Sequence, residues 1–352
     1  MQVVYDTEQL GEYMARNAHL GEDNPFLVDK FIEGAIEIDV DAISDGDQVV
    51  VGGIMEHIEE AGIHSGDSSC SLPPYTLSES LVQEIVDAST KMAEEFGVVG
   101  LMNIQFAIQG SNLYVLEANP RASRTVPFVS KAIGRPLAKL AARTMLGDQL
   151  ASLGLTNQVV PEHFSVKAPV FPFNKFHGVD TLLGPEMQST GEVMGVDRNF
   201  GAAFAKAQMG AGTEIQKQGA VFLSVRDEDK RFALSLASRI HNLGHRIIAT
   251  RGTARAISNS GIPAEIVHKI HEGRPHVVDL IKNRQVSLII NTPSGRMERS
   301  DDQLIRSSAV SFQVPCITTL AAASATIQGL EWIHSRPLEV VSIQEHQAGI
   351  DQ

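Results

Sequence analysis

The chain has 352 residues, which is too long for one ordinary core. It is 43% hydrophobic and 20% charged, a normal balance for a globular protein. Its formal net charge of −13 excludes a general nucleic-acid or acidic-membrane binder, because such partners need a basic surface. Two cysteines without a CxxC motif give no support to a zinc site, and no apolar run is long enough for a membrane span. With no signal-peptide pattern at the start, we expect a cytoplasmic protein.

The first part of the chain mixes predicted strands and helices. In chain order we expect a helix opening at 6–10, strands over 26–32, 35–42 and 48–55, and helices over 77–96 and 124–146. In the second of these strands Glu37, Asp39 and Asp41 alternate with aliphatic residues. Period two therefore predicts that the three acids share one face of the sheet.

A hairpin signal at 110–112 joins two further predicted strands. With a loop of those residues, Gln105 faces Glu117 and Asn103 faces Asn119. Glu117 and Asn119 are two positions apart, so they share a face. One sheet face would then carry a carboxylate and several amide groups.

Oxygen ligands of this kind suit Mg²⁺ bound to phosphate groups. Arg121 and Arg124 follow directly and could balance the charge on a transferred phosphoryl group. The pattern therefore indicates a phosphoryl-transfer metal site. Spacing alone equally allows a solvated sheet face with ordinary salt bridges.

Prolines and glycines punctuate residues 148–216, which we interpret as a wrapping or connecting segment. From Ala220 onward strands alternate with helices, with strands expected over 220–225, 246–249, 265–267 and 286–290 and a helix over 229–243. This alternation predicts a doubly wound parallel α/β domain. We place the domain boundaries at 1–147, 148–211 and 212–352.

Ligands of such sheets bind beyond the carboxyl ends of the strands. The polar residues at or near these ends are Ser224, Lys230, Thr250, Thr253, Lys269 and Asn291. Hydroxyls, amides and lysines near helix N-termini can form a phosphate pocket, or they can simply cap the helices. Both interpretations can hold together.

Several motifs resemble the second ATP-grasp unit of carbamoyl-phosphate synthase large chains: EIDVDA at 37–42, GIMEHIE at 53–59, GIHSGDS at 62–68, NIQFA at 103–107 and EANPRASRTVPFVSK at 117–131. An E-x-N-x-R ending alone occurs in many ATP-grasp ligases, whereas the joined run through Lys131 is highly specific. In the second half, residues 223–226, 249–253, 269–276 and 289–296 look like the methylglyoxal-synthase-like regulatory domain of the same family. The resemblance covers essentially the whole chain.

The resemblance implies phosphorylation of carbamate by ATP with Mg²⁺ or Mn²⁺ and K⁺. Gln105, Glu117 and Asn119 would hold the divalent metals, and Glu117 and Arg124 would be catalytic, with Arg124 stabilising the γ-phosphoryl group. Lys30 and Ile32 would line the adenine, and Glu37 would take the ribose hydroxyls. Gly62, Ile63, His64 and Ser65 would form a loop against the nucleotide, with Glu37, His57 and Ser68 near the monovalent cation.

For the second half, the resemblance implies binding of UMP or IMP by Ser224, Lys230, Thr250, Thr253, Lys269 and Asn291. Glu59, Asp67 and Thr318 match ornithine-contacting positions. Ala168 stands where the family has a further ornithine-contacting glutamate, and Pro293 stands where it has a ligand-contacting threonine. Loss of a carboxylate that pairs with an ammonium predicts weakened ornithine binding.

The family's glycine-rich flap, a basic residue on the triphosphate and the whole first synthetase half have no counterpart in this sequence. We therefore expect a fragment with little or no carbamate kinase activity by itself, which in the full enzyme works with a small glutaminase subunit and as a homo-oligomer. The alternative is that this chain serves only as a nucleotide-binding regulatory and oligomerisation module. Methylglyoxal synthase activity is disfavoured, because 273–276 and 291–293 lack the aspartates needed for proton abstraction.

Overall fold

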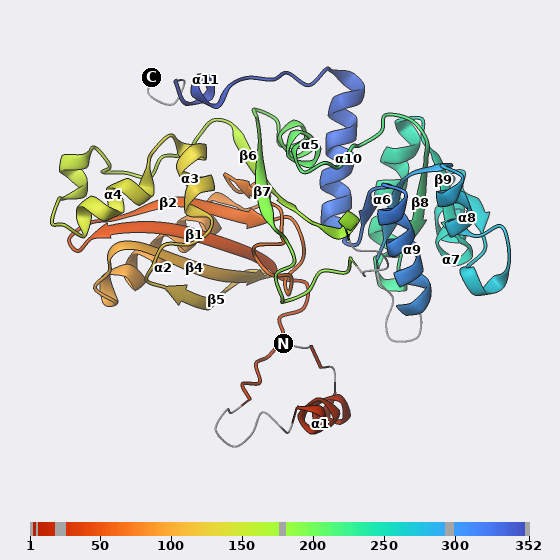
Figure 1. Cartoon of the computed structure of the whole chain (residues 1–352), viewed down its shortest axis with the longest axis horizontal. Coiled ribbons are helices and arrows are strands. Elements are labelled where there is room, and N and C mark those ends of the chain that lie inside the picture. Colours follow the sequence, from red (N-terminus) through yellow and green to blue (C-terminus); the bar gives the residue numbers. More distant parts are fainter. Residues whose placement is uncertain (1–2, 5, 18–25, 176–180, 293–298, 349–352) are drawn as a thin grey trace.

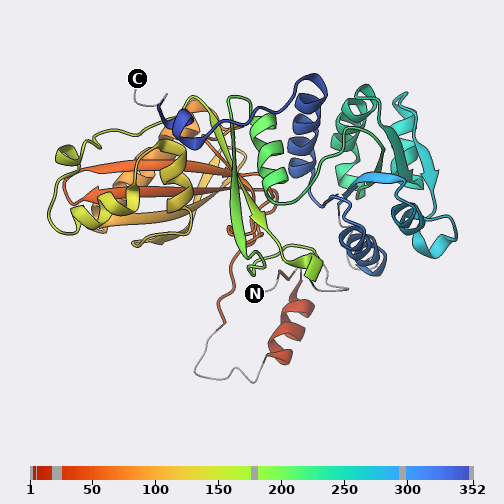
Figure 2. The same ribbon diagram turned by 45° about the horizontal axis from the view of Figure 1, so that its top comes forward.

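The computed structural model describes residues 3–4, 6–17, 26–175, 181–292 and 299–348. Within these ranges the chain forms a seven-stranded sheet and a five-stranded sheet. The two sheets lie at opposite ends of an elongated molecule, with helices α5 (Phe200–Gly210) and α10 (Leu320–Ser335) between them (Figures 1 and 2). The expected combination of an α+β unit with a parallel α/β unit is confirmed.

The first sheet is antiparallel throughout. Its strands, in sheet order, are β5 (Asn112–Asn119), β4 (Val99–Gln109), β1 (Ile36–Asp45), β2 (Val49–His57), β3 (Cys70–Leu72), β6 (Phe164–Val170) and β7 (Gly191–Asp197). The helices of this half are α1 (Thr7–Arg16), α2 (Glu79–Glu95), α3 (Val126–Ile133) and α4 (Leu137–Thr144), with the short 3-10 helices η2 (Leu150–Leu153) and η3 (Phe173–Lys175). Helix α1 buries none of its residues and lies apart from both sheets (Figure 1).

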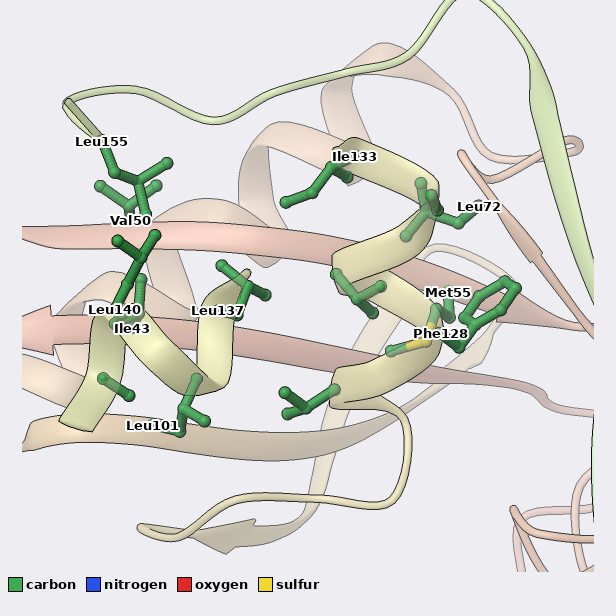
Figure 3. Close-up of a cluster of buried hydrophobic side chains, with 14 of the residues drawn as sticks. Ile43, Val50, Met55, Leu72, Leu101, Phe128, Ile133, Leu137, Leu140 and Leu155 are labelled. Atoms are coloured by element: carbon green, nitrogen blue, oxygen red, sulfur yellow. The ribbon is translucent and has the colours of Figure 1, made fainter. Parts of the chain in front are cut away.

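Alternation along β1 divides its side chains between two cores. Ile38 and Val40 pack with α2 on one face of the sheet. Ile43 lies on the other face beneath α3 and α4, in a cluster that includes Phe128 and Leu137 (Figure 3). The odd-numbered acids of β1 share this second face with Ile43, as the sequence predicted.

The second sheet is parallel. Its strands, in sheet order, are β10 (Glu265–Val267), β9 (Arg246–Thr250), β8 (Ala220–Ser224), β11 (Val286–Asn291) and β12 (Cys316–Ile317). One face packs on α6 (Lys230–Asn242), α7 (Arg251–Asn259) and α10, and the other on α8 (Val277–Lys282) and α9 (Arg299–Ser311). Because helices cover both faces of a parallel sheet, the doubly wound prediction is confirmed. This half also contains the 3-10 helices η4 (Asp227–Asp229) and η5 (Ile270–Glu272).

The chain end returns to the first half. Helix α11 (Ile343–Ala348) contacts α3, and the Gln347 side chain donates a hydrogen bond to the Lys131 carbonyl at 3.0 Å (Figure 1). Together with the α5–α10 contact, this segment joins the two ends of the molecule.

Three expected elements differ from the structure. Residues 26–32 form no strand. The helix expected over 124–146 is two helices, because Gly134 adopts φ +66° and Pro136 follows it. Residues 148–216 supply β6, β7 and α5, so this segment extends the first sheet as well as connecting the halves.

Candidate active site

A cavity of about 360 Å³ lies on the sheet face that carries the acids of β1. Strands β4 and β5 supply one wall of it, the residues leading into α3 supply a second, and the loop after β2 and the start of β7 supply the others. Its polar lining is Asp39, His64, Ser65, Asn103, Gln105, Glu117, Asn119, Arg121, Ser123, Arg124, Thr125, Lys167, Ser189, Thr190 and Glu192.

The expected pairing across the hairpin is confirmed, although by a different geometry. Gln105 lies opposite Glu117 and Asn103 opposite Asn119. The loop has two residues rather than three, since Gln109 pairs with Asn112, and Leu116 is the extra residue of a β-bulge that restores the register. Asn119 Nδ2 donates to Glu117 Oε1 at 2.9 Å, so the two side chains lie together.

Two hydrogen bonds from strand residues hold the loop 62–66 against the sheet. Gln105 Nε2 donates to Ser65 Oγ at 3.2 Å, and Lys167 Nζ donates to the Ser65 carbonyl at 2.9 Å. Lys167 is only 1% exposed although it is a lysine. Because its ammonium lies at the cavity beside the Ser65 carbonyl and the carboxylate of Asp39, it adds a fixed positive charge to the site.

A buried ionic group lies beside the cavity. His57 Nε2 is 3.0 Å from Asp39 Oδ2, and His57 Nδ1 is 3.5 Å from Glu37 Oε2. Burial opposes the charge on His57, but its hydrogen bond to Asp39, its ion-pair contact with Glu37 and the charges of both carboxylates raise its pKa to about 9. Burial likewise opposes the charge on Asp39, but the hydrogen bond and charge of His57 and the charge of Lys167 lower its pKa.

The predicted residues divide into two groups. The cavity brings together His64, Ser65, Gln105, Glu117, Asn119 and Arg124. It is not lined by Lys30, Ile32, Glu37, Gly62 or Ile63. Glu37 is nevertheless joined to the loop, because its Oε1 accepts the Gly62 N–H at 3.0 Å.

The segment with Lys30 and Ile32 is irregular and lies against the same loop. A Cβ on Gly62, which has φ +99°, would come within 2.9 Å of the Phe31 ring. Glycine at 62 therefore permits both the backbone conformation and the close approach of this segment.

The cavity contains functional groups that sequence reasoning missed. Asp39 had a signal, because it alternates with Glu37 and Asp41. Lys167 had none, because it lies 102 positions after Ser65, whose carbonyl it contacts, in a proline-punctuated segment. Only the pairing of β6 with β3 brings it to the cavity.

The donor set fits a divalent ion that is shared with phosphate. Gln105, Glu117 and Asn119 offer carboxylate and amide oxygens on one wall, as Mg²⁺ prefers. Over the described ranges, no cluster of three His, Cys, Asp or Glu residues could hold a metal by itself. A metal here would therefore complete its coordination with ligand or water oxygens.

In the second half, the predicted residues gather at the carboxyl ends of the strands. Ser224, Thr250 and Lys269 line a cavity of only about 20 Å³ together with Asp301 and Asp302 of α9. Thr253 Oγ1 accepts the Val225 N–H at 3.3 Å.

Asn291 and Lys230, the remaining members of this set, also contact other protein side chains. Asn291 Nδ2 donates to Asp302 Oδ1 at 3.0 Å. Lys230 Nζ pairs with Asp227 at 2.5 Å and lies at the start of α7, 3.3 Å from a Cβ placed on Gly252. Pro293 lies outside the described residues.

Two of the three ornithine-matching residues line one cavity between the halves. Glu59 and Thr318 lie on its wall, and its volume is about 320 Å³. Burial raises the pKa of Glu59 to about 7. Asp67 is separate, because its two carboxylate oxygens accept the N–H groups of Gln188 and Ser189 at 2.8 and 2.9 Å.

Comparison with known proteins finds a family match in each half. Residues 1–153 match the family described as carbamoyl-phosphate synthase L chain, ATP binding domain, and residues 232–318 match the MGS-like domain. A solved chain titled "Biotin Carboxylase domain of single-chain bacterial carboxylase" has a TM-score of 0.42 at 22% identity, covering 53% of this chain and 49% of that one, and adds nothing to the sequence match. Among the described helices, none combines the length and apolarity needed to cross a bilayer.

Curated relatives match almost the whole chain. The carbamoyl phosphate synthase large chains of Synechocystis sp. and Pseudomonas aeruginosa are each 51% identical, over 348 and 350 residues, and that of Archaeoglobus fulgidus is 52% identical over 347. These matches cover 98%, 99% and 98% of this chain but only 32% of each relative, so the chain spans about a third of their length. By sequence, the chain is homologous to the C-terminal part of carbamoyl phosphate synthase large chains.

Proposed function

We propose that the chain supplies one side of an ATP-dependent carbamate-phosphorylating site, within a carbamoyl-phosphate synthase that uses glutamine and serves pyrimidine and arginine synthesis. The observation that carries this proposal is the convergence of Gln105, Glu117 and Asn119 with Arg124 on one cavity. A carboxylate, two amides and a guanidinium are the groups that a metal-bound triphosphate needs.

In the reaction, a carbamate oxygen attacks the γ-phosphorus of ATP, the bond from that phosphorus to the β,γ-bridging oxygen breaks, and ADP leaves. Magnesium or manganese, when bound, neutralises charge on the phosphate oxygens. Gln105, Glu117 and Asn119 orient the metal-bound triphosphate from the sheet, and Arg124 donates to the transferred phosphoryl group. The loop with His64 and Ser65 covers the site and keeps water from carbamate.

The buried group beside the cavity suits a monovalent cation. Glu37 supplies a carboxylate near His57, and Ser68 Oγ is buried with no hydrogen-bond partner among the described residues. An orphaned buried hydroxyl is costly unless a ligand completes it. The K⁺ site is proposed on the resemblance, and Glu37 and Ser68 would have to hold the ion against the positive charge of His57.

The second half is proposed to bind a regulatory nucleotide, UMP or IMP, at Ser224, Lys230, Thr250, Thr253, Lys269 and Asn291. The cavity there is too small for a nucleotide, which needs a few hundred Å³. Asp301 and Asp302 also oppose an anion at this position. Binding therefore requires α9 to move away from Asn291.

The remaining partners are proposed on the resemblance alone: a glutaminase subunit and self-association. For ornithine, the structure offers Glu59 and Thr318 in one cavity while Asp67 is engaged elsewhere and Ala168 carries no charge. Weak ornithine binding therefore remains our expectation.

A chimera tests the catalytic proposal. This whole chain would replace the matching C-terminal part of the Pseudomonas aeruginosa large chain, and ATP formation from ADP and carbamoyl phosphate would be measured. We expect turnover by the chimera and none by the chain alone. A folded chimera without turnover would contradict the proposal, and UMP binding by such a chain would favour the alternative of a purely regulatory module.

A further inference from the structure

Asp41 lies buried beneath the turn that carries Arg124. The residue is 1% exposed, on the β1 face that floors the cavity. Its Oδ1 accepts the Ser123 hydroxyl at 2.7 Å, and its Oδ2 accepts the Thr125 hydroxyl at 2.7 Å. The two residues that flank Arg124 in the chain are therefore both held by one carboxylate.

The same carboxylate also reaches the strand of the proposed metal ligands. Asn103 Nδ2 donates to Asp41 Oδ1 at 3.0 Å, and Asn103 pairs with Asn119 across the hairpin. Asp41 thus connects β1, β4 and the turn before α3 at a single point.

The hydroxyls of this turn do not serve the helix that follows. Ser or Thr at a helix start ordinarily accepts a backbone N–H of the first turn. Thr125 is the residue before α3, yet it has a helical backbone conformation and makes no side-chain cap hydrogen bond. Because both hydroxyls donate to Asp41, the turn is anchored to the sheet instead of capping its own helix.

Among the residues that the structure describes, no basic side chain contacts Asp41, and its side-chain donors Asn103, Ser123 and Thr125 are all neutral. Burial raises the pKa of Asp41 to about 6, and the hydrogen bonds from Thr125, Ser123 and Asn103 offset this only in part. A carboxylate buried in this way is unfavourable for stability, since a buried charge without an ionic partner costs free energy. Two of its hydrogen bonds come from the residues on either side of Arg124.

We propose that Asp41 is a positioning residue for phosphoryl transfer: by holding Ser123 and Thr125 it fixes the backbone from which Arg124 reaches the γ-phosphoryl group. This inference rests on the proposed function of the cavity. Misplacing a group that stabilises a transition state by about 1 Å can cost on the order of 10²-fold in rate. Loss of the anchor should therefore lower kcat while leaving nucleotide affinity nearly unchanged.

A double-mutant cycle in the chimera described above tests the proposal. The variants are Asp41→Asn, Arg124→Ala and both together, with Thr125→Val as a second way to remove the anchor. Asp45→Asn is the matched control, because Asp45 is on the same strand but accepts the N–H of Leu150, away from the turn. The readouts are kcat and KM for ADP, with hydrogen exchange of residues 121–126 in this chain alone.

We expect Asp41→Asn and Thr125→Val to lower kcat about 10- to 100-fold with little change in KM, and to speed exchange of the turn. In the Arg124→Ala background the same changes should have less than about a threefold further effect. Equal losses in both backgrounds, or normal kcat in Thr125→Val, would overturn the positioning role. If Arg124→Ala itself leaves kcat unchanged, the proposed function fails instead; if Asp41→Asn does not fold, Thr125→Val decides.

Discussion

Glu117 faces Gln105 because Leu116 is bulged out of the register set by the hairpin loop. Continuing the pairing of Gln109 with Asn112 without a bulge would place Leu116 opposite Gln105 and turn Glu117 to the other face. The bulge therefore decides that the carboxylate, and not a leucine, points into the cavity.

Glu117 supplies the one carboxylate among the three proposed metal ligands. Glu117→Gln keeps the size and the hydrogen bond from Asn119 but removes the negative charge that attracts a divalent ion. We expect turnover of the chimera to fall about 10²- to 10³-fold, in the range found when one electrostatic contact to the transition state is lost. The assay is ATP formation at increasing Mg²⁺.

The control for Glu117 is Glu95→Gln, an exposed change at the end of α2. It should leave the Mg²⁺ dependence unaltered. Wild-type rates in Glu117→Gln at low Mg²⁺ would contradict its assignment as a ligand.

Lys230 tests the proposed nucleotide site of the second half. Lys230→Ala removes an ammonium that lies at the start of α7. Since a charge-assisted hydrogen bond contributes about 1.5–3 kcal/mol, UMP affinity should fall roughly 10- to 100-fold. Calorimetric titration of the chain with UMP measures this; Lys217→Ala is the control, and an equal loss in both variants would point to general charge instead of a specific site.

Gly201 tests the contact between α5 and α10. A Cβ at this position would lie 2.6 Å from the Gln328 backbone oxygen, too close for any real contact. A helical Gly→Ala change ordinarily stabilises by roughly 0.5–1 kcal/mol, but here the clash with backbone reverses the sign. We expect Gly201→Ala to destabilise the chain by about 1–3 kcal/mol in urea unfolding.

Gly191→Ala serves as the comparison, because no atom lies within 4 Å of a Cβ there. It should unfold like the parent chain. A stabilised Gly201→Ala variant would show that the helices separate readily.

His57 makes stability depend on pH. Its pKa of about 9 in the folded chain exceeds the ordinary value of about 6.5, so the folded state binds the proton more tightly. The resulting stabilisation is fully present below about pH 6.5 and is lost as pH rises through about 9. We expect a loss on the order of 1–3 kcal/mol over this window.

His57→Gln should remove that pH dependence, whereas the exposed His241→Gln on α6 should retain it. Urea unfolding at pH 6, 7.5 and 9 checks the difference between each variant and the parent. If the difference in unfolding free energy between His57→Gln and the parent stays constant with pH, His57 is not a protonated, ion-paired residue.

Local periodicity predicted much of this molecule. Period two placed the acids of β1 on one face, strand–helix alternation predicted the parallel sheet, and the strand-end rule located the cluster around Thr250 and Asn291. These predictions succeed because the direction of a side chain depends on its own strand alone. The same logic misjudged the hairpin loop and residues 26–32, where no local pattern reports a bulge or an irregular path.

The sequence by itself determined which residue types share a face and which strand ends gather polar groups, since both follow from backbone geometry over a few residues. Only the tertiary structure decided that Lys167 lies under Ser65, that Asp41 holds the turn before α3, and that Asp302 occupies the partner position of Asn291. These contacts join segments far apart in the chain through strand pairing and burial. These contacts are stabilised only when the distant segments pack together, so no short stretch of sequence can predict them.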